Sequence, residues 1–129
     1  MRLGRKQDET PFERWGGQPF FDALVERFYE GVVTDPLLRP MYPDDLTISK
    51  AHLALFLAQY WGGPDDYNAI RGHPRLRMRH TPFVIGKDEA IAWMRHMTAA
   101  VDGADLSEED RAVLIEYLEM AARSLQNAH

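Results

Sequence analysis

A stretch rich in proline and glycine separates two halves of the chain that both repeat hydrophobic residues at helical spacing. The interrupting residues are Pro64, Gly72, Pro74, Pro82 and Gly86. Proline and glycine placed this closely leave room for only short helical turns. An irregular connection of about 20 residues is uncommon inside a compact helical domain and is usually functional. The sequence therefore predicts helices on both sides of an irregular segment that carries the binding site.

Four long helices are predicted, two before this segment and two after it. Before it, hydrophobic residues recur at three- and four-residue steps from Pro19 to Val32 and again from Thr47 to Trp61. A corner at Tyr42-Pro43 separates these stripes, because the position before a proline disfavours helical geometry. After it, one stripe covers residues 87–101, and another follows Ser107, which begins a sequence resembling a capping box. Since no alternating strand pattern accompanies them, the predicted fold class is all-α.

Composition limits the function classes that the chain can belong to. The net charge of -5 argues against a nucleic-acid-binding surface, which needs a basic excess. No apolar run reaches the roughly 20 residues that span a bilayer, so stable membrane insertion is not expected. The first residues lack the apolar run of a signal peptide, which predicts a cytoplasmic protein. The absence of cysteine excludes thiolate ligands, so a metal site must use histidine or carboxylates.

Histidines are therefore the first candidates for a metal site. They are His52, His73, His80, His96 and His129. His80 differs from the others because it ends a run rich in arginine and precedes Thr81-Pro82, where a short helix would stop. A haem iron takes a neutral imidazole ligand, and its two propionates need cations, so this run suits a haem site. A basic surface loop is the alternative, and His96 is expected to be a hydrogen-bonded, half-buried histidine.

Several segments of the sequence resemble the second group of truncated haemoglobins. In chain order they are Phe28-Tyr29, Met41-Tyr42-Pro43, YWGGP from Tyr60 to Pro64, RGHPRLRMRH from Arg71 to His80, Trp93, and YLEMAARS from Tyr117 to Ser124. The arginine-rich segment that ends in histidine is the most specific of them. The resemblance implies a two-over-two helical sandwich that encloses one haem b and comprises residues 15–129. Residues 1–14 lie outside the family pattern, and such a charged arm is expected to be flexible.

The resemblance also implies roles for individual residues. His80 becomes the proximal ligand of the iron, and Tyr29, Tyr42 and Trp93 become the polar residues on the distal side, where a ligand binds. The implied propionate partners and other haem contacts are Arg77, Arg79, Ser49, Leu53, Phe56, Tyr67, Met78 and Met97. The assignment of Ser49 and Leu53 depends on the register after the corner, because a slip of one residue would move both. The two tyrosines and the tryptophan also suit a hydrophobic core.

These roles imply a protein that binds O2, CO and NO at ferrous haem iron. Hydrogen-bond donors stabilise the partial negative charge on bound O2, so the expected release of O2 is slow. One alternative is a haem redox catalyst, either peroxidase-like or NO-oxidising, which would need an external reductant because the chain has no dinucleotide-binding fingerprint. Another alternative is a helical interaction module without a cofactor. The sequence is compatible with a homo-oligomer, since periodicity does not distinguish an interface from a solvent-exposed face.

Overall fold

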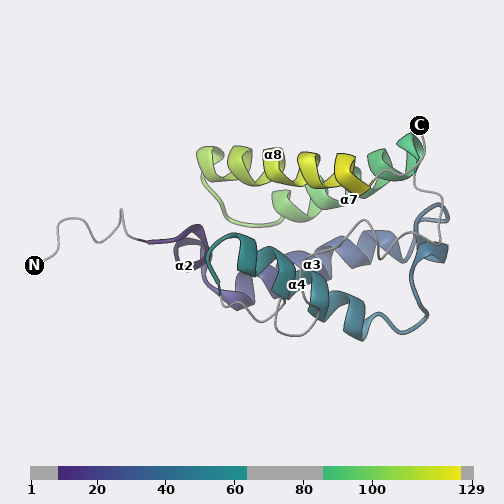
Figure 1. The fold of residues 1–129 in the computed structure, drawn as a ribbon, viewed down its shortest axis with the longest axis horizontal. Helices are drawn as coiled ribbons and strands as arrows, with labels where there is room; N and C mark the ends of the chain where they lie inside the picture. The colour runs from purple at the N-terminus through teal and green to yellow at the C-terminus, as the bar shows by residue number, and fades with distance from the viewer. Residues whose placement is uncertain (1–8, 64–85, 126–129) are drawn as a thin grey trace, which may run out of the picture.

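The computed structural model describes residues 9–63 and 86–125, and in these ranges it contains helices and no strand (Figure 1). The elements are α2 (Pro11–Trp15), α3 (Gln18–Val32), the 3-10 helix η1 (Arg39–Met41), α4 (Thr47–Tyr60), α7 (Lys87–Asp102) and α8 (Glu108–Leu125). The four long helices begin and end close to the residues that the hydrophobic stripes and their flanking breakers predict. The all-α prediction is therefore confirmed.

Two pairs of helices form two layers. Helix α3 packs against α4 in one layer, and α7 packs against α8 in the other (Figure 1). Helix α3 also contacts α7, which joins the layers. The buried stripe of α3 consists of Phe21, Leu24, Val25, Phe28, Tyr29 and Val32. It forms one core with Leu57 of α4, Met97 of α7, and Leu114 and Leu118 of α8. This is the predicted two-over-two arrangement.

Helix α2 begins with a hydrogen-bonded capping box. The Oγ1 atom of Thr10 accepts a hydrogen bond from the backbone N–H of Glu13, and the Glu13 carboxylate accepts one from the N–H of Thr10, both at 3.2 Å. This exchange satisfies backbone donors that a helix start otherwise leaves unpaired. Arg14 then forms an ion pair with Asp110 of α8, with 2.9 Å between Nη2 and Oδ1. Helix α2 is thereby attached to the second layer.

Aromatic residues of α2 pack on the core and correct the predicted boundary of the N-terminal arm. The backbone N–H of Phe12 donates to the carbonyl of Trp61 at 2.9 Å, and the Phe12 ring stacks on Phe21 with centroids 5.9 Å apart. Trp15 is 8% exposed. The sequence assigned residues 1–14 to a flexible arm, whereas the last four of these lie in a capped and packed helix. Residues 1–8 lie outside the described part of the chain.

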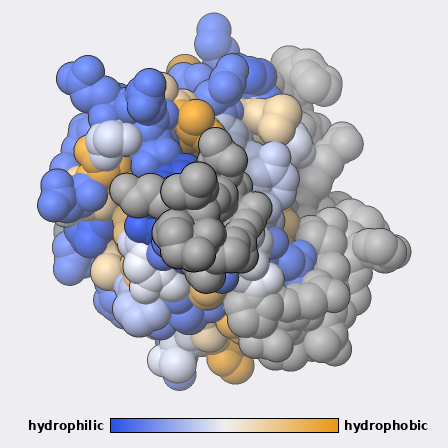
Figure 2. Space-filling model, turned by 90° about the vertical axis from the view of Figure 1, so that its left-hand side faces the viewer, coloured by the Kyte–Doolittle hydropathy of each residue, from blue (hydrophilic) through white to orange (hydrophobic). Residues whose placement is uncertain are grey.

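The described surface at the end that carries α2 is mainly hydrophilic, and its hydrophobic side chains form separate small patches (Figure 2). Over the whole described surface, the exposed large hydrophobic residues are Val33, Leu37, Ile48, Tyr60, Ile91, Val113 and Met120. Single exposed residues of this kind are normal for a folded domain. Among the described helices, none combines the length and hydropathy needed to cross a bilayer.

Candidate functional site

Three polar aromatic residues from separate parts of the chain meet where the two layers join. Tyr29 lies in the last turn of α3, Tyr42 directly follows η1, and Trp93 lies on α7. The rings of Tyr29 and Tyr42 are edge to face, with centroids 5.4 Å apart and an interplanar angle of 83°. Phe28 packs edge-on against both Tyr29, at 5.0 Å, and Trp93, at 5.5 Å. The fold thus brings together the three residues predicted for the distal side; we call them the aromatic trio.

The aromatic trio is a connected polar group in a hydrophobic environment. Tyr29 is 3% exposed and Trp93 is 6% exposed, while Tyr42 is partly buried. Burial raises the pKa of Tyr42 to about 12, and hydrogen bonding from Trp93 and Tyr29 offsets part of the rise. Burial also raises the pKa of Tyr29, with smaller contributions from Tyr42. Both phenols therefore keep their protons at neutral pH, so both remain hydrogen-bond donors.

Helix α4 carries three of the other residues that the sequence predicts as haem contacts. Ser49, Leu53 and Phe56 follow one another at spacings of four and three residues, which puts them on one face of this helix. Leu53 is 8% exposed, whereas Ser49 and Phe56 are partly buried. Met97 lies one turn after Trp93 on α7 and is fully buried. The apolar side chains of Leu53, Phe56 and Met97 suit contact with the flat, largely apolar face of a porphyrin.

The remaining predicted site residues lie in the segment 64–85, outside the described residues. They are the predicted iron ligand His80, the predicted propionate partners Arg77 and Arg79, and the predicted haem contacts Tyr67 and Met78. The described residues therefore include only those predicted for the distal side of a haem. There, grouped donors within hydrophobic surroundings match a small, partly negative ligand, and the apolar residues of α4 and α7 match a porphyrin wall.

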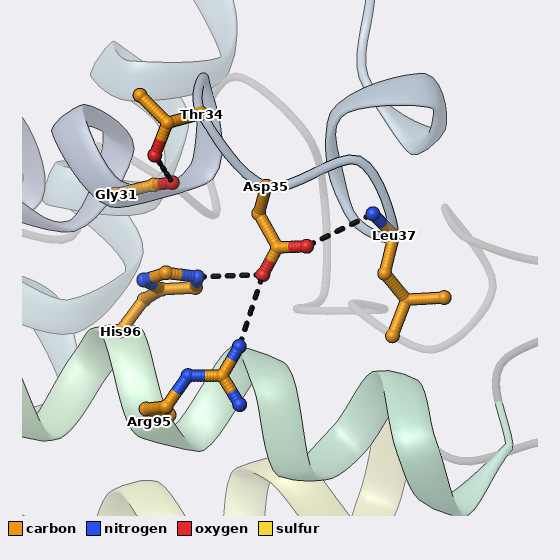
Figure 3. Close-up of polar contacts among 6 residues, drawn as sticks. All are labelled: Gly31, Thr34, Asp35, Leu37, Arg95 and His96. Atoms are coloured by element: carbon orange, nitrogen blue, oxygen red, sulfur yellow. Dashed lines mark hydrogen bonds and ion pairs between the residues drawn. The ribbon is translucent and has the colours of Figure 1, made fainter.

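His96 has the hydrogen-bonded, half-buried position that the sequence predicts. Its side chain is 17% exposed, and its Nε2 atom lies 2.7 Å from Oδ2 of Asp35. Asp35 follows the C-terminal end of α3, is 8% exposed, and also accepts hydrogen bonds from the backbone N–H of Leu37 and from Arg95 (Figure 3). Asp35 is not among the residues that the sequence predicts for a site. Its only local signal is an aspartate before a proline, which is typical of a turn.

The buried carboxylate of Asp35 predicts a specific acid sensitivity. Hydrogen bonding, first from His96 and then from the backbone N–H of Leu37, lowers the pKa of Asp35 below the ordinary value of 3.8. A lowered pKa means that the folded state favours the charged form, so this stabilisation is present at neutral pH and is lost as the pH falls. Asp35→Asn should destabilise the protein at neutral pH and reduce the further loss of stability on acidification.

Urea unfolding at a series of pH values from neutral to about pH 3 measures this effect, since the loss begins near pH 5 and continues below it. Asp105→Asn removes an equal charge at an exposed position and serves as the control. If the free energy of unfolding of the parent and of Asp35→Asn falls equally with pH, the assigned role of the carboxylate is contradicted, whatever the difference between them at neutral pH.

Comparison with known proteins finds extensive similarity to bacterial globins. Residues 10–127 match the family model described as bacterial-like globin. The chain is 43% identical to the group 2 truncated haemoglobin YjbI of Bacillus subtilis over 118 residues, which are 92% of this chain and 89% of that protein. The matched region includes all the described helices as well as residues 64–85.

Solved structures agree with this similarity. The haemoglobin of the thermophilic phototrophic bacterium Chloroflexus aurantiacus is 46% identical, with a TM-score of 0.90 over 94% of this chain and 100% of that chain. A structure described as a truncated oxygen-avid haemoglobin from Bacillus subtilis is 42% identical, with a TM-score of 0.85 over 92% of this chain and 100% of that chain. The likeness therefore covers fold and sequence together, across nearly the whole length of each protein.

Proposed function

Because the chain belongs to the bacterial-like globin family, among the group II truncated haemoglobins, we propose that it encloses haem b and binds O2 tightly beneath the aromatic trio. Membership of the family supports the general function, which is globin-type binding of diatomic gases such as O2 at haem. One observation supports the finer proposal: Tyr29 of α3, Tyr42 directly after η1 and Trp93 of α7 meet at one largely buried place. When bound, haem supplies an iron with an open coordination position for the ligand.

The aromatic trio supports tight binding through its hydrogen bonds. A ligand such as O2 takes up partial negative charge, and donors held in a water-poor site stabilise that charge without having to reorient. The raised pKa values keep both phenols protonated, and the contacts among the three residues hold them in position. The related Bacillus subtilis protein described as oxygen-avid is in keeping with slow release. CO and NO are further ligands that the same pocket is proposed to accept.

The opposite face of the haem is proposed to contact the segment 64–85. His80 is the proposed iron ligand, because a neutral imidazole there leaves the distal position open. The proposed propionate partners and wall contacts are Arg77, Arg79, Ser49, Leu53, Phe56, Tyr67, Met78 and Met97. An external reductant is proposed to return the iron to the ferrous state, because the sequence carries no dinucleotide-binding fingerprint for a reductase cofactor.

Absorption spectra of the purified protein test the proposal. The parent should show a Soret band that shifts on reduction with dithionite and again on exposure to CO or O2. His80→Ala should weaken this band or change its coordination pattern, because the iron loses its protein ligand. His52→Ala is the matched control, since it removes a partly buried histidine from α4 and should leave the spectrum unchanged.

Two outcomes would contradict parts of this proposal in different ways. A parent protein that stays colourless after reconstitution with haem would favour the helical interaction module without a cofactor. Haem binding that is indifferent to His80→Ala would retain the globin but move the iron ligand to another histidine, with His96 and His52 next in order.

A further inference from the structure

A buried carboxylate outside the aromatic trio connects helix α7 to the segment between α3 and α4, residues 33–46, which we call the corner. Asp35 lies in the corner, and its Oδ2 atom accepts hydrogen bonds from two α7 side chains, at 2.7 Å from His96 Nε2 and 3.2 Å from Arg95 Nη2 (Figure 3). Its Oδ1 atom accepts from the backbone N–H of Leu37 at 2.9 Å. Both carboxylate oxygens are therefore satisfied, as a buried charge requires. We call the contact between Asp35 and His96 the corner clamp.

The imidazole of His96 is fixed from a second side by the backbone of α3. Gly31 lies directly against it, and a Cβ atom at Gly31 would overlap the His96 ring. The absence of a side chain at Gly31 thus lets the ring lie between helix α3 and the corner. His96 is 17% exposed in this position, so it is a packed side chain with little room to turn.

From Asp35, backbone and side-chain hydrogen bonds lead to Tyr42. The carbonyl of Asp35 accepts a hydrogen bond from the N–H of Arg39 at 2.8 Å. The Arg39 guanidinium in turn donates to the carbonyls of Tyr42, at 3.2 Å, of Pro43, at 3.0 Å, and of Asp44, at 3.1 Å. Hydrogen bonds therefore connect the two ends of the corner, from Asp35 of the corner clamp to Tyr42.

On α7, the clamp and the aromatic trio share one side of the helix. His96 follows Trp93 by three residues, a spacing that places both side chains on neighbouring positions of the same helix face. The corner thus attaches to α7 at two places, through Asp35 with His96 and through Tyr42 with Trp93. Two attachments prevent the corner from rotating against α7 as well as from moving away from it. A single attachment would still allow the corner to rotate about that contact.

We infer that Asp35 and His96 are positioning residues that hold Tyr42 in register with Trp93 and thereby slow the release of the distal ligand. This inference rests on the proposed function, because it concerns a ligand held by the aromatic trio. Neither residue needs to touch the ligand. A hydrogen-bond donor displaced by even part of an ångström loses much of its contribution, since these interactions weaken steeply with poor geometry.

A matched pair of substitutions at His96 tests the inference in the haem-loaded protein. His96→Leu removes both ring nitrogens, and His96→Gln retains a donor for Asp35. We expect His96→Leu to accelerate O2 release by about tenfold, the equivalent of one hydrogen bond, and His96→Gln to stay within about twofold of the parent. The infrared stretching band of bound CO, which responds to nearby donors, should shift or split in His96→Leu and return towards the parent in His96→Gln.

Two controls separate positioning from general stabilisation. Asp110→Asn breaks another ion pair between elements, the one that joins α2 to α8, and should leave both readouts unchanged. In a Trp93→Phe background, His96→Leu should change O2 release by less than about twofold, because interacting residues give non-additive effects. A lower melting temperature without a change in release or in the CO band would overturn the inference, as would a full tenfold effect in the Trp93→Phe background.

Failure of the inference is distinct from failure of the proposed function. A parent protein that binds O2 and releases it slowly, beside a His96→Leu variant that behaves identically, would remove only the positioning role. A parent protein that binds no haem would remove the proposed function, and the positioning role with it.

Discussion

Replacing Tyr29, Tyr42 and Trp93 together by phenylalanine is expected to accelerate O2 release about a hundredfold. Each net hydrogen bond to a partly charged ligand contributes about 1.5 kcal/mol, and two acting together give about two orders of magnitude in rate. Phenylalanine keeps an aromatic ring at each position, so the substitutions remove the polar atoms and leave most of the hydrophobic packing. Stopped-flow displacement of O2 by excess CO measures the release rate directly.

Single substitutions show how the effect is distributed among the three residues. Tyr42→Phe should have the largest single effect, because Tyr42 is hydrogen bonded to both Tyr29 and Trp93 and its loss disconnects them. Tyr117→Phe is the matched control, since Tyr117 is a partly buried tyrosine that stacks on Tyr60 with centroids 4.0 Å apart. A triple variant that releases O2 at the parent rate would show that slow release has another cause.

The long helices were predictable because their signals are local. A stripe of hydrophobic residues at helical spacing marks α3 from Phe21 to Val32, and proline and glycine mark where helices end. The short helix α2 has no such stripe, because a helix of five residues makes little more than one turn. Its signals are the Thr10–Glu13 capping box and the proline between them, which are weak beside the charged residues that predict an arm.

The candidate site was less predictable because it depends on contacts between distant residues. Tyr42 and Trp93 each suit a hydrophobic core, and no spacing within the sequence indicates that they meet. The resemblance to a family predicted that they share a site, and the fold shows the contacts between them. The pair formed by Asp35 and His96 lies 61 residues apart in the chain. Neither residue alone carries a signal for the other, so only the packing of the corner on α7 identifies the pair.

Phe28→Ala is expected to lower the free energy of unfolding by about 3–5 kcal/mol, the cost typical of removing a fully buried aromatic ring. Phe28 is 0% exposed and packs edge-on against both Tyr29 and Trp93. The truncation leaves a cavity behind two members of the aromatic trio, and the rigid helices around it can close that space only in part. Urea unfolding followed by far-ultraviolet circular dichroism measures the loss.

Two further substitutions test whether the loss of stability comes from the packing of Phe28 against Tyr29 and Trp93. Ile48→Ala at a position that is 66% exposed should change stability by no more than about 0.5 kcal/mol. Phe28→Leu retains most of the buried volume and should cost less than Phe28→Ala, yet it loses the ring edges that contact Tyr29 and Trp93. If Phe28→Leu releases O2 faster than the parent while remaining folded, Phe28 supports the geometry of the aromatic trio as well as the core. A loss of less than about 1 kcal/mol in Phe28→Ala would contradict the packing described for α3 and α7.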